Sequence, residues 1–144
     1  MNDDLDVPEN QEEFRLLLQK VARRIRGNRG DETISDSQLG VLFFLLLEGP
    51  RTPGELAARE HVSAPSMTRT VNELEKRGLV TRVPHTEDAR KIEVLPTDAG
   101  ETLAAETRRQ RFEWLSQRLA ELSPDERAAL ARSMPVLRRL AEES

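Results

Sequence analysis

The sequence contains no cysteine, only two histidines and few aromatic residues, and each shortage excludes a class of site. Without cysteine there is no disulfide framework, thiolate zinc site, iron–sulfur cluster or thiol-based redox sensor. Two histidines cannot form a histidine-rich metal site, so we expect neither a metal nor a cofactor. Aromatics make up 3% of the 144 residues and apolar residues 37%, so the core must come from leucine, alanine and valine and looks thin for a self-sufficient monomer.

The sequence also lacks a long apolar run, a basic leader and an excess of positive charge. Its longest apolar stretch, residues 39–47 interrupted by Gly40, is about half as long as a membrane span, so we expect no membrane partner. The first six residues are acidic where secretory and transit peptides are basic, which predicts a cytoplasmic protein. Because the formal net charge is −4, any polyanionic partner must be met by a local basic patch.

Apolar periodicity and capping signals predict several helices. Apolar residues at helical spacing between Phe14 and Ile25 form one stripe, which indicates a first helix. A capping box at residues 35–38 precedes the apolar run at 39–47. A buried strand is the alternative interpretation of that run, but the box and the Gly-Pro pair that follows favour a central helix surrounded by protein. Thr97 caps a long helix that runs past Trp114. A capping box at Ser123 starts the last helix.

Residues 52–96 carry the signals of a helix-turn-helix followed by a hairpin. Thr52 and Ser63 cap a short helix reaching about Arg59 and a second helix continuing to Arg77, with a turn of about three residues between them. Residues 79–83 and 91–95 carry β-branched residues and flank a polar seven-residue tip, which predicts two strands. The predicted fold class is mainly α with a small β-hairpin wing, divided into a winged helix-turn-helix lobe and a helical dimerisation lobe.

A helical wheel of residues 63–77 separates a core side, with Ala64, Met67, Val71 and Leu74, from a polar outward side. Such a face alone would more simply be a solvated surface, but the short turn, the capped preceding helix and the following hairpin together favour DNA. Arg69 can pair with guanine and Asn72 can read adenine in a major groove. The residues expected to bind double-stranded DNA, including three at the hairpin tip, are Pro65, Ser66, Thr68, Arg69, Thr70, Asn72, Lys76, Asp88, Arg90 and Lys91.

The uneven distribution of charge along the sequence also favours DNA binding by the middle of the chain. Between Arg51 and Lys91 there are eight basic and six acidic residues, an excess of +2, whereas the rest of the chain has 14 basic and 20 acidic residues, an excess of −6. This asymmetry indicates that the middle of the chain meets phosphate while the ends do something else.

The stretch 55–80, which ends in Leu-Glu-Lys-Arg-Gly-Leu-Val, the Asp88-Ala89-Arg90 of the hairpin tip and the segment 95–100 together resemble the MarR family of bacterial transcriptional regulators. The resemblance covers nearly the whole chain. It implies a homodimeric winged helix-turn-helix protein that binds a pseudo-palindromic operator, usually as a repressor released by a small-molecule effector. It also implies that Arg90 enters the minor groove while Asp88 orients a basic neighbour. One departure is His61, a turn position where the family often has glycine; we interpret it as a turn residue at positive φ.

These expectations make residues 1–144 a single MarR-type domain, with a DNA-binding lobe at 35–96 and dimerisation helices at 11–33 and 97–144. Pairing the terminal helices of two copies would bury the apolar stripes that one copy exposes. We expect the dimer interface at Phe14, Leu17, Val21, Leu130, Leu137 and Leu140, although some of these can be core within one copy. An effector crevice where the lobes meet could be lined by Phe43, Phe44, Phe112 and Trp114, although aromatics at helical spacing are more often core.

Two other functions compete with DNA binding. A hydrolytic triad could be assembled on paper from Ser66, His61 or His85 and nearby acids, but the sequence has no nucleophile elbow, phosphate loop or metal-ligand spacing, so we expect no enzyme. The alternative is a helical dimeric protein–protein interaction module that uses the winged helix as a protein-binding surface. Salt dependence discriminates between them, because duplex binding weakens steeply as salt rises.

Overall fold

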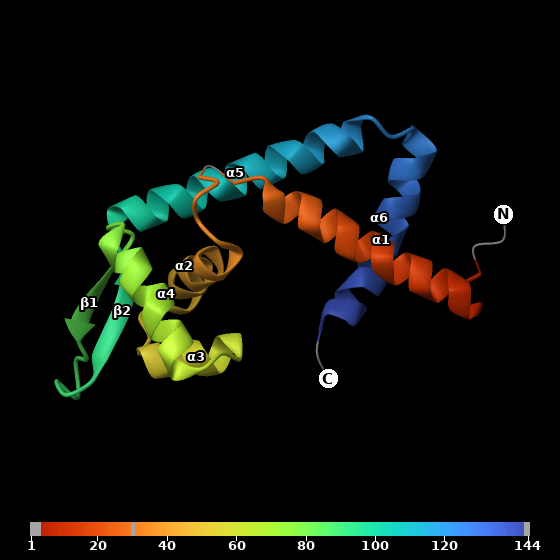
Figure 1. The fold of residues 1–144 in the computed structure, drawn as a ribbon. Helices are drawn as coiled ribbons and strands as arrows, with labels where there is room; N and C mark the ends of the chain where they lie inside the picture. Colours follow the sequence, from red (N-terminus) through yellow and green to blue (C-terminus); the bar gives the residue numbers. More distant parts are fainter. Residues whose placement is uncertain (1–3, 30, 143–144) are drawn as a thin grey trace.

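The computed structural model describes residues 4–29 and 31–142; residues 1–3, 30 and 143–144, which the predicted ranges include, lie outside the described residues. The elements form a compact lobe from which the long helix α5 leads to a second, helical lobe (Figure 1). In chain order they are α1 Pro8–Gly27, α2 Asp36–Glu48, α3 Pro53–Glu60, α4 Ala64–Lys76, β1 Val80–Pro84, β2 Ile92–Pro96, α5 Asp98–Ala120 and α6 Pro124–Ala141. The predicted fold class, mainly α with a β-hairpin wing, is confirmed.

Capping side chains set the helix starts, as the sequence predicted. The Ser35 hydroxyl accepts from the Gln38 amide at 3.1 Å while Gln38 Oε1 accepts from the Ser35 amide at 3.0 Å, and Ser123 with Glu126 repeats this box. Thr97 caps α5 through the Gly100 amide at 3.2 Å. The first helix is the exception, because α1 begins at Pro8 rather than at residue 11. Proline is suited to that first turn, where its missing N–H has no helical partner.

The buried core lies in the compact lobe, with α2 at its centre. Its side chains come from residues 34–94 and pack between α2, α3, α4 and the hairpin; they are Ile34, Leu39, Val41, Leu42, Leu45, Leu56, Ala57, Met67, Val71, Leu74, Leu79, Val80 and Val94. The predicted helix over residues 39–47 is confirmed, but the expectation that protein surrounds it is wrong at its end. Leu47 is 76% exposed, because the helical repeat places it opposite the buried stripe.

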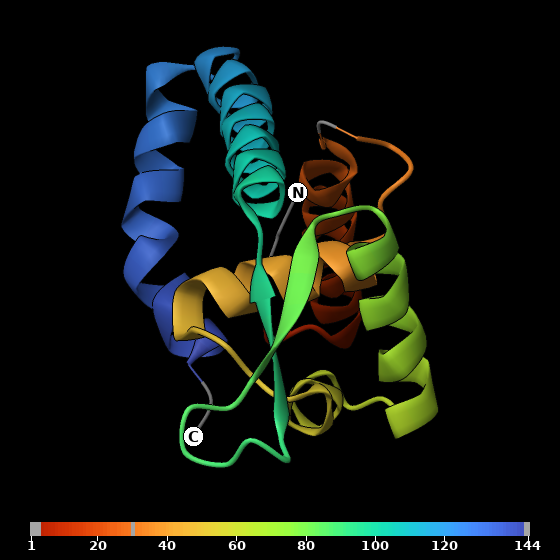
Figure 2. The same ribbon diagram turned by 90° about the vertical axis from the view of Figure 1, so that its left-hand side faces the viewer.

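The hairpin lies beside α4, in front of α2 in Figure 2. Its antiparallel register pairs Val80 with Pro96, so both strands sit one residue later than predicted around a seven-residue tip, 85–91. Arg51 adds a short bridge to β2, with N···O distances of 3.2 and 2.7 Å to Val94. At the base, Thr97 Oγ1 donates to the Gly78 carbonyl at 2.5 Å, which ties the start of α5 to the end of α4.

The helical lobe consists of α1, α6 and the far part of α5. Within the described chain no residue of α1 or α6 is buried, and the buried residues of α5 all lie in its first half. Among the residues that the structure describes, no helix is both long and apolar enough to cross a bilayer. Over the described ranges, one copy of the chain therefore has a core only in the compact lobe, which agrees with the thin core expected from composition.

Candidate nucleic-acid interface

The turn before α4 is built from three residues, 61–63, as the sequence predicted. His61 ends α3 in the left-handed region, with φ 54° and ψ 41°, which confirms its interpretation as a turn residue at positive φ. The Val62 amide donates back to the Ala57 carbonyl at 3.1 Å, and the Ser63 hydroxyl accepts from the Ser66 amide at 3.2 Å. The chain therefore reverses tightly, and α4 starts at the predicted residue.

One face of α4 is buried and the other is exposed. Met67, Val71 and Leu74 are buried as predicted, but Ala64 is exposed, because the first turn of the helix extends beyond the core. Thr70 is half-buried, and its hydroxyl donates to the Ser66 carbonyl at 3.2 Å. The remaining α4 residues expected to contact DNA all lie exposed: Pro65, Ser66, Thr68, Arg69, Asn72 and Lys76.

The two carboxylates of this helix are both engaged. Glu73 Oε2 accepts from Gln38 Nε2 at 2.7 Å, and Glu75 Oε1 accepts from Arg82 Nη1 at 2.6 Å. Arg69 makes no such contact with another described side chain, so its guanidinium remains available on the exposed face. The two carboxylates, which could repel a bound phosphate or compete with it for donors, are thus turned toward α2 on one flank and toward the hairpin on the other.

The wing tip presents an arginine held by an aspartate. Asp88 Oδ1 accepts from the Arg90 amide at 3.1 Å and from Arg90 Nε at 3.2 Å. These bonds, the amide first, hold the pKa of Asp88 below its usual range. The Arg90 side chain is 93% exposed, so Asp88 orients a guanidinium that projects into solvent. Lys91 beside it is exposed as well.

His85 organises the same tip, a role that the sequence analysis missed. Its Nδ1 accepts from the amides of Glu87 and Asp88 at 3.1 and 3.2 Å, and its Nε2 lies 3.5 Å from Glu93 Oε1. Both ring nitrogens of His85 therefore face partners inside the hairpin. A histidine directly before a polar turn was the signal available.

Arg82 is the second residue that the sequence analysis missed. It lies on β1 opposite the buried Val94 and reaches α4, where it donates to Glu75 Oε1 at 2.6 Å and to Asn72 Oδ1 at 2.7 Å. The available signal was that Arg82 lies directly across the hairpin from the apolar Val94, on the side of the strands that faces the core. A charged group at such a position requires partners. Through Arg82 the hairpin and α4 are joined by directional bonds.

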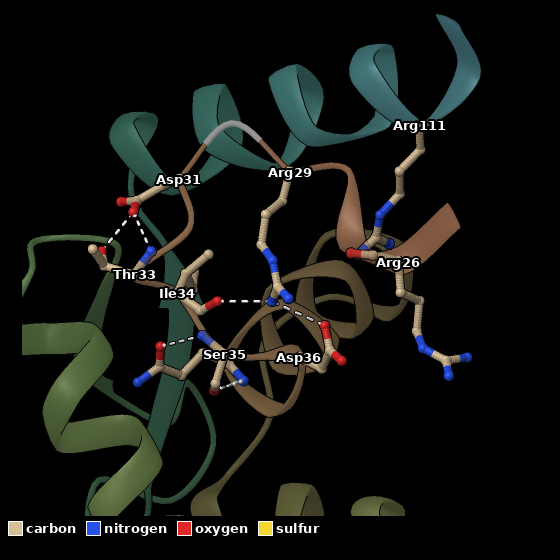
Figure 3. Close-up of polar contacts among 9 residues, drawn as sticks. Arg26, Arg29, Asp31, Thr33, Ile34, Ser35, Asp36 and Arg111 are labelled. Atoms are coloured by element: carbon tan, nitrogen blue, oxygen red, sulfur yellow. Dashed lines mark hydrogen bonds and ion pairs between the residues drawn. The ribbon is translucent and has the colours of Figure 1, made fainter. Parts of the chain in front are cut away.

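The linker between α1 and α2 contacts the end of α4 on the side away from the hairpin, and Figure 3 shows the polar contacts within this linker. Arg29 Nη1 donates to the Ile34 carbonyl at 2.9 Å and to Asp36 Oδ1 at 3.0 Å. Asp31 accepts from the Thr33 hydroxyl at 2.5 Å and amide at 2.8 Å, and these bonds, with the help of Arg77, lower the pKa of Asp31. Arg77 pairs with Asp31 at the end of α4, so an ion pair joins the linker to that helix.

The junction of the two lobes carries Arg111 of α5. Figure 3 shows its side chain reaching Arg26, whose carbonyl accepts from Nη2 at 3.3 Å. Its guanidinium also lies over the Phe43 ring, 5.4 Å from the centroid. Burial lowers the pKa of Arg111 against the opposing effect of Asp36, and nearby Arg29 and Arg26 lower it further. The buried Nε of Arg111 has no hydrogen-bond partner among the described residues.

The four aromatics expected to line an effector crevice do not gather in one place in this chain. Phe43 lies under Arg108 and Arg111 of α5, whereas Phe44 lies under Arg51 and Arg59. The other two are both on α5 but two residues apart, so they face different ways; Phe112 is exposed and Trp114 is half-buried.

An open apolar groove of about 670 Å³ lies between α1, α5 and α6. Five of the six residues expected at a dimer interface line it, while Leu140 lies outside the lining and is 67% exposed. The lining residues are Phe14, Leu17, Leu18, Val21, Leu115, Leu119, Arg127, Leu130, Ala131, Ser133, Met134 and Leu137. In the described part of the chain, no three His, Asp or Glu side chains gather in a way that could hold a metal ion.

Comparisons with known proteins add to this geometry. Residues 33–91 match the MarR family. A helix-turn-helix transcriptional regulator of Mycobacterium tuberculosis is 40% identical over 129 residues, which are 90% of each chain. A Pseudomonas aeruginosa structure, solved as that of a transcriptional regulator protein, is 32% identical, covers 100% of both chains and has a TM-score of 0.83. A mutant of S. aureus MepR, solved bound to an oligodeoxyribonucleotide, shares the fold with a TM-score of 0.71 at 16% identity, over 92% of this chain and 97% of that chain.

Proposed function

This chain belongs to the MarR family of helix-turn-helix transcriptional regulators, and on that premise we propose a homodimeric repressor that binds a pseudo-palindromic operator and is released by a small-molecule effector. The observation that carries DNA binding is the exposed polar face of α4 beside a hairpin tip from which Arg90 projects. Since a transcriptional regulator acts where the DNA is, the protein works in the cytoplasm of a bacterial cell.

The two reading elements suit the two grooves of a duplex. A helix fits the major groove, and the Arg69 guanidinium can give a bidentate pair to guanine O6 and N7 there. An arginine at the tip of a rigid hairpin can enter a narrow A·T-rich minor groove, where the negative potential is enhanced. The bond that Arg90 Nε donates to Asp88 Oδ1 orients the Arg90 side chain for that purpose. Lys76, exposed at the end of α4, can contact phosphate.

A second copy of the chain is the partner that best fits the helical lobe. Two helices without a buried residue, α1 and α6, face each other across an apolar groove. Amphipathic helices of this kind gain most of their stability by packing the apolar face. Pairing them about a two-fold axis would also place two copies of α4 about 34 Å apart, which is one turn of duplex and explains a pseudo-palindromic operator.

The junction of the lobes is where we place the effector. The unpartnered Nε of Arg111, with Arg26 and Arg29 nearby, favours an acidic compound. The linker there follows α1 directly and holds the end of α4 through Asp31 and Arg77, so a ligand could alter the position of the reading helix. Release requires that the effector bind the two dimer geometries with different affinity.

Selection of a preferred duplex from a random pool, followed by affinity measurements from low to high salt, tests DNA binding. We expect log K to fall linearly with log salt, with a slope of about −0.9 per phosphate contact. Binding that shows no salt dependence would support the protein–protein module instead. For the effector, candidate acids are titrated into the protein–operator mixture, and if none of the compounds that bind alters operator affinity, release by this route is wrong.

Two arginine variants test the reading elements separately. Arg69→Ala should relax preference at one base position by about 1–3 kcal/mol. Arg90→Ala should weaken binding mainly at A·T-rich flanks and reduce the salt slope by about one contact. Arg109→Ala is the matched control, because that arginine lies on α5 and is already paired with Glu106 and Glu113. Unchanged binding in both test variants would remove these contacts from the proposal.

A further inference from the structure

The contact between Arg82 and Asn72 determines which atoms the reading helix can offer to a base. Arg82 Nη2 donates to Asn72 Oδ1 at 2.7 Å, and Nη1 of the same guanidinium donates to Glu75 Oε1 at 2.6 Å. A guanidinium carries only donors, so the Asn72 group that faces it must be the carbonyl oxygen. The orientation of this amide is therefore fixed by chemistry, and its NH₂ points away from Arg82.

An asparagine amide that recognises adenine uses both its oxygen and its NH₂ group. Adenine presents an N7 acceptor and an N6 donor in the major groove, so the asparagine must donate with Nδ2 and accept with Oδ1. In this structure Arg82 occupies one lone pair of Oδ1 and holds that oxygen toward the hairpin, and among the described residues Nδ2 donates to no acceptor. The end of the amide that Asn72 turns away from the hairpin, toward a bound base, is therefore its donor. Guanine, with acceptors at both N7 and O6, is the base that suits such a group best.

Two features keep Arg82 in this position. Glu75 neutralises its charge, and a charge-assisted bond of this kind is stronger than one between neutral groups. Its side chain is only 29% exposed, and on β1 it stands opposite the buried Val94, so its stem packs against the lobe rather than extending freely into water. The guanidinium fork is thus already oriented before any DNA arrives.

We propose that Arg82 is a specificity-determining residue that directs Asn72 to guanine, and away from adenine, at one base position of each half-site. This inference rests on the proposed function, because it requires that α4 reads a major groove. Arg82 acts through Asn72 and is therefore a positioning residue. Its removal lets the amide turn, so that Oδ1 and Nδ2 can both face a base, which adenine matches.

The test measures base preference with the full-length protein and its selected operator. All four base pairs are placed in turn at every operator position, and competition gives their relative affinities for the wild type and the variants. We expect one position per half-site at which the wild type favours guanine and Asn72→Ala shows no preference. At that position Arg82→Ala should shift the adenine-to-guanine ratio toward adenine on the order of tenfold. The double variant should behave as Asn72→Ala does.

A matched control separates this effect from the loss of a positive charge. Arg77→Ala also removes an arginine at the end of α4, one that pairs with Asp31 and makes no contact with Asn72. It should change affinity for all four base pairs alike and leave the ratio unchanged. Asn72→Asp provides a second test that keeps Arg82 in place. This variant retains the acceptor for Arg82 but presents oxygen in place of NH₂, so guanine preference should be lost in favour of cytosine or adenine.

The outcomes that overturn the inference differ from those that overturn the proposed function. If Arg82→Ala lowers affinity for the four base pairs equally, Arg82 only fastens the hairpin to α4, and the inference is wrong while DNA reading stands. Guanine preference that survives in Asn72→Asp also overturns it, whether or not Arg82→Ala folds. A wild-type protein that selects no duplex at all would instead defeat the proposed function itself.

Discussion

Leu140→Asp tests whether the helical lobe is an interface between two copies of the chain. Leu140 is near the end of α6 and is 67% exposed, so within one copy its side chain makes little contact. Replacing it should leave the fold of a single copy nearly unchanged, because surface substitutions away from packed features usually have small effects. A change in association therefore cannot be attributed to a collapse of the protomer.

The expected magnitude follows from the exposed fraction. Full burial of a leucine side chain stabilises by about 1.5–3 kcal/mol, so burying the remaining two thirds contributes about 1–2 kcal/mol. In a two-fold dimer the residue occurs twice, which doubles this to about 2–4 kcal/mol. Aspartate adds the cost of removing a carboxylate from water without a partner. The dissociation constant of the dimer should rise by at least about a hundredfold.

Sedimentation equilibrium over a range of concentrations measures this constant directly for wild type and variant. Val62→Asp, a substitution of an exposed apolar residue in the turn before α4, is the control and should leave association unchanged. A wild-type chain that remains monomeric would refute the reasoning. So would an unchanged dimer constant in both Leu140→Asp and Leu130→Asp, since the second residue lines the groove itself.

Two further predictions concern stability within one copy. A Cβ at Gly100 would overlap the Leu79 carbonyl oxygen, so Gly100→Ala should lower the free energy of unfolding by about 1–3 kcal/mol in urea titrations, whereas Gly27→Ala, with open space around it, should not. The pKa of Asp31 is lowered in the folded state by Thr33, so its contribution is present above its ordinary pKa of about 3.9 and is lost as the pH falls through the folded value. The difference in urea midpoint between wild type and Asp31→Asn should therefore shrink below about pH 4; a difference that is constant from pH 6 to pH 3 would contradict this.

Local signals predicted the elements well, because capping is decided within a few residues. The boxes at Ser35 and Ser123 place the starts of α2 and α6, since the side chain that satisfies the first free amides lies only three residues from its partner. Burial is not local in this sense. The exposure of Ala64 depends on how far the core extends along the helix, which the period of the sequence does not encode.

In the candidate site too, features set by local sequence were predicted and features set by packing between elements were not. The exposed residues of α4 could be predicted from a helical wheel, since one buried stripe defines the opposite face. The roles of Arg82 and Arg111 could not, because their partners come from other elements, 10 and 85 residues away for Asn72 and Arg26. Which arginine reaches which acceptor follows only after the hairpin and helices have packed.

The contacts that the sequence did not reveal fix the orientation of α4. Apolar burial stabilises α4 without direction, so the buried stripe alone would tolerate some rotation about the helix axis. Hydrogen bonds weaken steeply as their angles change. On the hairpin side, Arg82 donates a hydrogen bond to Asn72 of α4. On the opposite flank, Gln38 at the start of α2 donates one to Glu73 of α4. Since these bonds oppose rotation in both directions, the core holds α4 in the lobe while the polar contacts set the angle at which Arg69 faces outward.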